Sequence, residues 1–150
     1  MFEDSDAIAL LTESHQSLVN ELAALEHLTV HLGGGPGTAA LDLLSDAVAV
    51  LPTRLMKHMA TEEREVYPKL VAHLGSLEVE SMLEDHREIR RWIGRLVRAH
   101  AELDRRTPDL GPVRWTLYVV IGVVNLHLRK EEVAYLRFMS ERVGSAPAMG

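Results

Sequence analysis

The sequence predicts an all-α protein, an up-down-up-down bundle of four helices. Three observations favour this fold class. Breaks rich in glycine and proline divide the 150 residues into four long segments. Apolar residues recur at steps of three and four along each segment. No stretch alternates polar and apolar residues over the length of a strand. The length suits one domain that covers residues 1–150.

The breaks set the expected helix boundaries. The runs GGGPG at 33–37 and RTPDLGP at 106–112 interrupt a helix, because glycine favours turns and proline lacks the backbone N–H group. A weaker break, HLGS, lies at 73–76. We therefore expect four helices, at about 5–32, 38–72, 77–105 and 113–143.

Each expected helix carries one stripe of mostly apolar residues, the pattern of helices that pack at about 20° to one another. The first two stripes are Ile8, Leu11, His15, Leu18, Leu22 and Leu25, and Leu44, Val48, Leu51, Leu55, His58, Glu62 and Val66. The last two are Val79, Met82, His86, Ile89, Ile93, Leu96 and His100, and Leu117, Val120, Val124, His127, Glu131, Ala134 and Phe138.

The helix ends and one interior proline add local expectations. Thr38 and Ser76 are expected to cap the second and third helices with their hydroxyl groups, and Pro112 suits a first helical position. Pro52 lies inside the second helix and is expected to kink it or to start a new helix.

Composition excludes several classes of function. The net charge of −6 and the lack of a basic stripe argue against nucleic acid as a partner. Cysteine is absent, which removes disulfides and thiolate metal sites. The start, MFEDSDAIALL, lacks the positive charge of a secretory signal, and the run LYVVIGVV is far shorter than the roughly 20 residues of a membrane span. We expect a cytoplasmic protein without a membrane partner.

Two segments repeat the same polar pair inside their apolar stripes. HMATEEREVYP, at 58–68, and HLRKEEVAYL, at 127–136, both read His-x-x-x-Glu-Glu. A histidine and a glutamate four residues apart lie on the same helix face. The other two stripes each carry a histidine as well. The candidate site therefore has six residues: His15, His58, Glu62, His86, His127 and Glu131.

The six candidates are expected to meet at one depth of the bundle. Counted from the connecting loops, the histidines of paired helices differ in depth by about 5 Å and about 8 Å, at ~1.5 Å per residue. Burial of carboxylates without a partner is costly, and a divalent cation offsets that cost. Imidazole and carboxylate donors without sulfur suit iron, zinc, manganese or nickel. Six ligands exceed one tetrahedral zinc and fit two ions, each with two histidines, bridged by both carboxylates.

A structural role is the alternative interpretation. A single histidine on an apolar face is usually a hydrogen-bonded core residue, whereas four at matched depth, two of them followed by glutamate, favour a metal site. A bundle that binds adventitious zinc stays open as an alternative. Ferritin-like centres use Glu-x-x-His pairs, and no glutamate stands three residues before His58, His86 or His127.

These motifs resemble the hemerythrin-like HHE cation-binding family over roughly residues 5–143. The matching residues are His15, His58, Glu62, Glu63, Tyr67, Pro68, His86, His127, Glu131 and Glu132. The resemblance implies a four-helix bundle around a non-haem di-iron centre. It also implies that His15 and His58 hold one iron, that His86 and His127 hold the other, and that Glu62 and Glu131 bridge them.

The chain departs from the oxygen carriers of this family at two positions. Arg90 stands where those carriers have a second helix-three histidine, and arginine cannot ligate because it stays protonated. Glu131 follows its histidine by four residues, where the carriers have an aspartate five residues on. The pattern is more similar to iron-cluster repair and stress-linked HHE proteins, although the cysteine-containing part of the repair proteins is missing. Arg90 could anchor an incoming anion, but we expect it to pair with an acid at the edge of the stripe, such as Glu84 or Glu88. Glu63 and Glu132 could be hydrogen-bond partners of the ligand imidazoles, but we expect them to face solvent.

The expected function is that of a non-haem di-iron protein that binds or reacts with O₂, NO or peroxide at an open iron position, in oxidative or nitrosative stress or in redox sensing. Zinc or manganese could replace iron. The alternative is an iron-binding module that stores, donates or senses iron. Whether the protein is an enzyme stays open; a weak peroxidase or oxidase activity is compatible with the site. We expect a monomer or a homodimer.

Overall fold

The computed structural model describes residues 2–35 and 37–144, with the side chains of residues 9, 11–35 and 37–141. Its elements are α1 (Phe2–His31), the 3₁₀ turn η1 (Leu32–Gly34), α2 (Thr38–Thr61), the π-helical turn η2 (Glu62–Val66), α3 (Tyr67–Leu74), α4 (Ser76–Ala101) and α5 (Gly111–Gly144). The described residues contain no strand. None of the described helices is long and apolar enough to cross a membrane.

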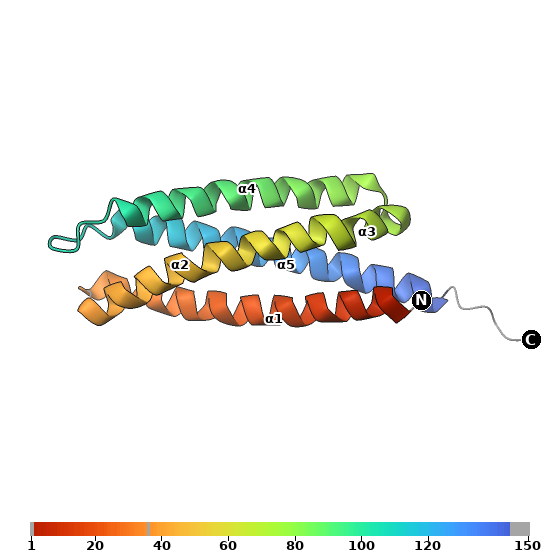
Figure 1. The fold of residues 1–150 in the computed structure, drawn as a ribbon, viewed down its shortest axis with the longest axis horizontal. Helices are drawn as coiled ribbons and strands as arrows, with labels where there is room; N and C mark the ends of the chain where they lie inside the picture. Colours follow the sequence, from red (N-terminus) through yellow and green to blue (C-terminus); the bar gives the residue numbers. More distant parts are fainter. Residues whose placement is uncertain (1, 36, 145–150) are drawn as a thin grey trace, which may run out of the picture.

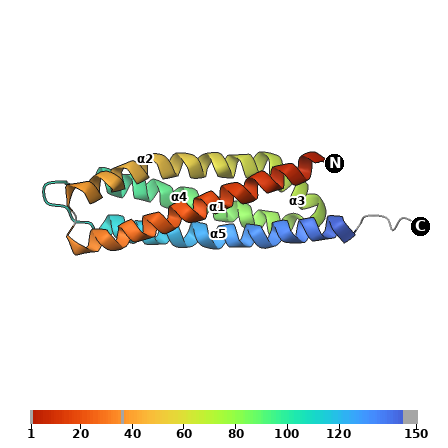
Figure 2. The ribbon, with the colours of Figure 1, turned by 90° about the horizontal axis from the view of Figure 1, so that it is seen from below.

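The helices form four antiparallel rods, because α2, η2 and α3 follow one another directly and act as one rod. Figure 1 shows that α1 and α4 run in one direction while α2–α3 and α5 run back. Contacts join α1 to α2, α2 to α4, α4 to α5 and α5 to α1, so the rods close into a ring of four. Figure 2 shows the same bundle after a quarter turn. The predicted up-down-up-down bundle is confirmed.

The predicted breaks lie where the helices end, with one difference in length. α1 ends at His31, and Gly35 has a positive φ of 84° in the following turn, as a glycine allows. α4 ends at Ala101, several residues before the expected 105. The carboxylate of Asp104 accepts hydrogen bonds from the backbone N–H of Arg106 at 2.9 Å and the hydroxyl of Thr107 at 3.2 Å. These local bonds compete with a continued helix.

One local expectation was wrong. Gly37 and Gly75, rather than Thr38 and Ser76, hold the cap positions before α2 and α4, and no side chain caps either helix. Gly75 has a φ of 92°, a conformation that residues with a Cβ rarely adopt. Pro52 lies inside α2, so of the two expected effects the start of a new helix is excluded, and a kink at this residue stays a prediction.

The second rod departs from α-helical geometry at η2. There the backbone N–H of Tyr67 donates to the carbonyl of Glu62, five residues earlier, which is the π-helical pattern. Pro68 follows at once; it has no N–H group, and its ring would clash with the carbonyl four residues earlier in a regular helix. The π-helical turn ends two residues before this proline. The turn inserts one extra residue between Glu62 and α3.

The predicted stripes form the core. Every stripe residue with a described side chain is buried except His100, which is half-buried; the side chain of Ile8 lies outside the described residues. The apolar members form two clusters. The larger contains residues such as Leu22, Leu51 and Ile93, and the smaller contains Leu70 and Phe138. Apart from His100, near the end of α4, the polar stripe residues lie between these two clusters along the rods.

Candidate metal centre

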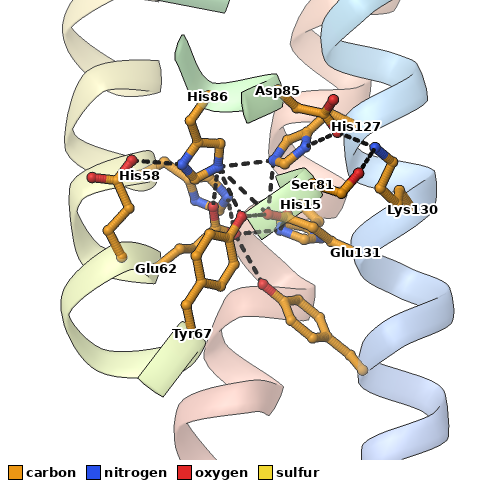
Figure 3. A network of polar contacts seen from close by, with 12 residues as sticks. His15, His58, Glu62, Tyr67, Ser81, Asp85, His86, His127, Lys130 and Glu131 are labelled. Atoms are coloured by element: carbon orange, nitrogen blue, oxygen red, sulfur yellow. Dashed lines mark hydrogen bonds and ion pairs between the residues drawn. The ribbon is translucent and has the colours of Figure 1, made fainter. Parts of the chain in front are cut away.

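Six polar side chains from all four rods converge in the layer between the two apolar clusters (Figure 3). They are the six predicted residues, with exposed fractions of 0% for His15, Glu62, His86 and Glu131, 3% for His127 and 9% for His58. For brevity we call them the polar layer. The depths estimated from loop lengths were therefore close enough to bring all six together.

The first half of the polar layer joins α1 to the second rod. His15 Nε2 lies 3.0 Å from Glu62 Oε1 and 3.0 Å from Glu131 Oε2. His58 Nε2 lies 2.8 Å from Glu62 Oε1. One ligand atom from each of these four residues falls within 4.8 Å of every other, a spacing at which all four could hold one ion.

The second half joins α4 to α5 around the same two carboxylates. His86 Nε2 lies 3.2 Å from Glu62 Oε2 and 3.6 Å from Glu131 Oε1. His127 Nε2 lies 2.7 Å from Glu131 Oε1 and 2.9 Å from His86 Nε2. These four residues also offer ligand atoms within 4.8 Å of one another. Glu62 and Glu131 thus belong to both groups.

Four buried atoms of the polar layer lack hydrogen bonds within the described chain. They are His15 Nδ1, on the outer side of its ring, and His58 Nε2, Glu62 Oε2 and Glu131 Oε2. The last three do have neighbours, at 2.8 Å, 3.2 Å and 3.0 Å, but without the geometry of a hydrogen bond. A buried polar atom without a partner costs about 1–3 kcal/mol. Imidazole nitrogens and carboxylate oxygens aimed at a common space fit a divalent cation, which would satisfy these atoms.

The outer nitrogens of three histidines have partners of their own. His86 Nδ1 donates to Glu63 Oε1 at 2.8 Å, and His127 Nδ1 donates to Asp85 Oδ2 at 3.1 Å. His58 Nδ1 shares a hydrogen bond with Ser14 Oγ at 3.0 Å. Such bonds leave Nε2 of each ring free to face inward.

Arg90 pairs with an acid, as expected, but with a different one, and the expectation that Glu63 faces solvent was wrong. Glu63 does not simply face solvent, because it binds His86 and also accepts a hydrogen bond from Arg90 Nη2 at 2.8 Å. Arg90 therefore pairs with Glu63 rather than with Glu84 or Glu88. Glu132 is exposed, as expected.

Two buried tyrosines bind the shared carboxylates and were not assigned a polar role from the sequence. Tyr135 donates to Glu62 Oε1 at 3.2 Å, and Tyr67 donates a short hydrogen bond to Glu131 Oε1. Tyr135 stands four residues after Glu131, a spacing that could have revealed it. Tyr67 stands five residues after Glu62 and reaches the layer through the extra residue of η2.

In the metal-free protein, the charged form of each histidine and glutamate described below is stabilised by opposite charges beside it. Burial by itself lowers the pKa of His15, but its contacts with Glu131 and Glu62 outweigh burial and raise it to about 9. Burial likewise lowers the pKa of His86, and contacts with Glu131, Glu62 and Glu63 raise it to about 9. Burial raises the pKa of Glu62 and Glu131, yet the histidine contacts bring both below their usual range. Without metal the layer is a buried network of ion pairs.

The remaining histidines lie elsewhere. His27 and His31 are exposed, and their rings contact one another at a tilted angle, with centroids 4.4 Å apart. His100 bonds to Ser45 Oγ at 3.1 Å. His73 lies in α3 rather than in a loop and packs edge-on against Phe138.

Comparison with known proteins gives one match. The family model "Hemerythrin HHE cation binding domain" matches residues 6–138. No curated protein matches the chain, and no solved structure does. The matched range contains all six residues of the polar layer.

Proposed function

We propose, because the chain belongs to the hemerythrin HHE cation-binding family, that its polar layer is a non-haem di-iron centre. In this assignment His15 and His58 hold one iron, and His86 and His127 hold the other. Glu62 and Glu131 bridge the two ions. The observation that carries the proposal is that two four-residue groups, each compact enough for one ion, share the same two buried carboxylates.

The donor chemistry fits iron. Sites with two histidines and a carboxylate that leave positions open are typical of non-haem iron proteins. Four protein ligands for each ion leave room for a small exogenous ligand. Arg90 is bound to Glu63 outside the layer and adds no ligand to the ion at His86. When bound, the iron pair would supply redox chemistry and an open position for O₂, NO or peroxide.

The chain itself orients and shields this position. Outer hydrogen bonds to Ser14, Glu63 and Asp85 fix the ring planes of three histidines. Tyr67 and Tyr135 hold hydroxyl protons at the two bridging carboxylates. Met59, next to His58 in the chain, is 2% exposed and belongs to the larger apolar cluster. The burial of the six ligands would keep bulk water away from the ions.

We place this activity in the response to oxidative or nitrosative stress, or in redox sensing. The proposal rests on the resemblance to stress-linked HHE proteins and on the burial of the polar layer. The second candidate, an iron store or donor, uses the same ligands and differs in how readily iron leaves.

Metal analysis of freshly purified protein, with an absorption spectrum of the same sample, tests the proposal. We expect about two irons per chain and near-ultraviolet charge-transfer bands that change on addition of azide, NO or O₂. One colourless zinc, or no metal in a stable bundle, would reject a di-iron centre. If a chelator removes both irons rapidly, and if the absorption bands do not change on addition of azide, NO or O₂, the result would favour an iron store or donor.

A further inference from the structure

We propose that the two metal positions are not equivalent: the position at His86 and His127 retains its ion, and the position at His15 and His58 exchanges its ion with solvent. This inference rests on the proposed function, because it assumes that both positions are filled. It goes beyond that function because it assigns exchange of the ion with solvent to one of the two metal positions.

The outer partners of the four histidines differ between the two positions. His86 and His127 each donate from Nδ1 to a carboxylate, that of Glu63 at 2.8 Å and that of Asp85 at 3.1 Å. His58 has only the neutral hydroxyl of Ser14, at 3.0 Å. His15 Nδ1 has no hydrogen-bond partner within the described chain.

A carboxylate partner makes an imidazole a stronger donor to metal than a neutral partner does, and loss of such a partner costs 10- to 100-fold in affinity. Both carboxylates are also held in place by cations. Arg90 Nη2 binds Glu63 at 2.8 Å. Lys130 Nζ binds Asp85 Oδ2 at 2.5 Å and Ser81 Oγ at 3.1 Å. Glu63 and Asp85 therefore act as positioning residues for the ion at His86 and His127.

The access of solvent also favours exchange at the position of His15 and His58. His58 is the most exposed residue of the polar layer, at 9%. A surface pocket of about 470 Å³ reaches both His58 and Ser14, with Lys57 and Glu65 on its lining. A smaller pocket of about 350 Å³ reaches His127, but Asp85 and Lys130, joined as an ion pair, line it beside the ring (Figure 3). An ion at His58 thus has a weaker donor set and the more open path.

Zinc release measures the difference without redox chemistry. The full chain is loaded with two equivalents of Zn²⁺ and mixed with an excess of a chromophoric chelator. We expect two phases of one ion each, with rates that differ by about tenfold or more. His58→Ala is expected to remove the fast phase and to keep the slow one.

Variants of the outer partners identify the cause. Glu63→Gln and Asp85→Asn are expected to speed the slow phase by about 10- to 100-fold and to leave the fast phase unchanged. Ser14→Asp, which offers His58 a carboxylate, is expected to slow the fast phase. Glu84→Gln is the matched control, because Glu84 neighbours Asp85 in sequence and pairs with exposed Arg87 at 2.5 Å.

Two results would overturn the inference while leaving the di-iron centre intact: release of both ions in a single phase, or a slow phase that Glu63→Gln and Asp85→Asn do not change. Failure of the native chain to bind two ions would overturn the proposed function, and this inference with it. Far-ultraviolet circular dichroism of each variant separates a lost fold from a changed rate.

Discussion

At the scale of single residues, Glu62 contacts three of the four histidines of the polar layer, as Glu131 also does. The two oxygens of Glu62 lie within 3.2 Å of His15, His58 and His86. His58, in contrast, contacts the layer through Glu62 and meets solvent on its other side. A change at Glu62 should therefore disturb both metal positions, whereas a change at His58 should disturb one.

We predict that Glu62→Ala lowers the metal content to well below one ion per chain, because it removes a ligand from both positions. His58→Ala should leave about one ion per chain. Elemental analysis of the purified variants, normalised to protein, measures both. His27→Ala, at an exposed histidine, is the control and should retain the native content. An unchanged metal content in Glu62→Ala would reject the assigned ligands.

A second prediction at this scale concerns pH and the metal-free protein. The pKa of His15 and that of His86 are raised from 6.5 to about 9 on folding. Their contribution to stability is therefore complete below pH 6.5 and is lost as the pH rises through 9. The lowered pKa values of Glu62 and Glu131 act in the opposite sense, because their contribution is lost as the pH falls below their usual range.

We therefore expect the free energy of unfolding of the metal-free protein to be highest at about pH 5–6.5 and to fall towards pH 9.5. The loss is on the order of 3 kcal/mol for each histidine at most. Urea unfolding at pH 6, 7.5 and 9.5 measures it. The His27→Ala control should show the same slope. Stability that is flat or rises between pH 6.5 and 9.5 would contradict the buried ion pairs.

At the scale of elements, the π-helical turn η2 sets the register of the second rod. His58, before the turn, and Glu62, its first residue, face the polar layer, and Tyr67 and Leu70, after the turn, belong to the smaller apolar cluster. The turn contains one residue more than an α-helical turn would. It therefore rotates α3 relative to α2 by about 100° compared with a regular helix.

Insertion of one alanine between Arg64 and Glu65 tests this role, because η2 already holds one extra residue. We expect the insertion to turn Tyr67 and Leu70 out of the core and to cost on the order of 3–5 kcal/mol, the range for loss of large core side chains. Thermal unfolding measures it, and the midpoint should fall by roughly 10 °C. Arg64→Ala changes an exposed side chain of the same turn without changing the register and should be near native. Equal midpoints for the two variants would show that the number of residues in η2 does not set the packing.

At the scale of the whole molecule, the polar layer joins all four rods between the two apolar clusters. Ions held there would link rods that are otherwise far apart in sequence. Because only the folded chain assembles the six ligands, bound metal stabilises the folded state by mass action.

We predict that the loaded protein unfolds about 5–10 °C above the metal-free protein. A free metal concentration of 100 times the dissociation constant supplies about 2.7 kcal/mol, and 1 kcal/mol corresponds to ~2–4 °C at this size. Calorimetry of loaded and chelator-treated samples measures the difference. Glu62→Ala should show little or none of it. Identical midpoints for the two native samples would contradict a metal that is held by all four rods.

Much of this architecture follows from patterns along the chain. Steps of three and four placed the apolar stripes, and glycine and proline placed the breaks, because both act within one helix or one turn. The same periodicity placed His58 and Glu62, and His127 and Glu131, on inward faces. The local errors, at the caps and at the end of α4, arose where a neighbouring glycine or Asp104 competed for the helix end.

The sequence by itself determined the four-helix bundle and the six inward polar residues, because the helical period fixes which residues lie on the same face of a helix. Only the tertiary structure decided what each residue meets across the bundle. Depth and rotation between rods depend on packing and on the extra residue of η2, and no pattern within one segment reports them. This is why Glu63 and Asp85 emerge as partners of His86 and His127, and Tyr67 as a partner of Glu131, only when the rods are assembled.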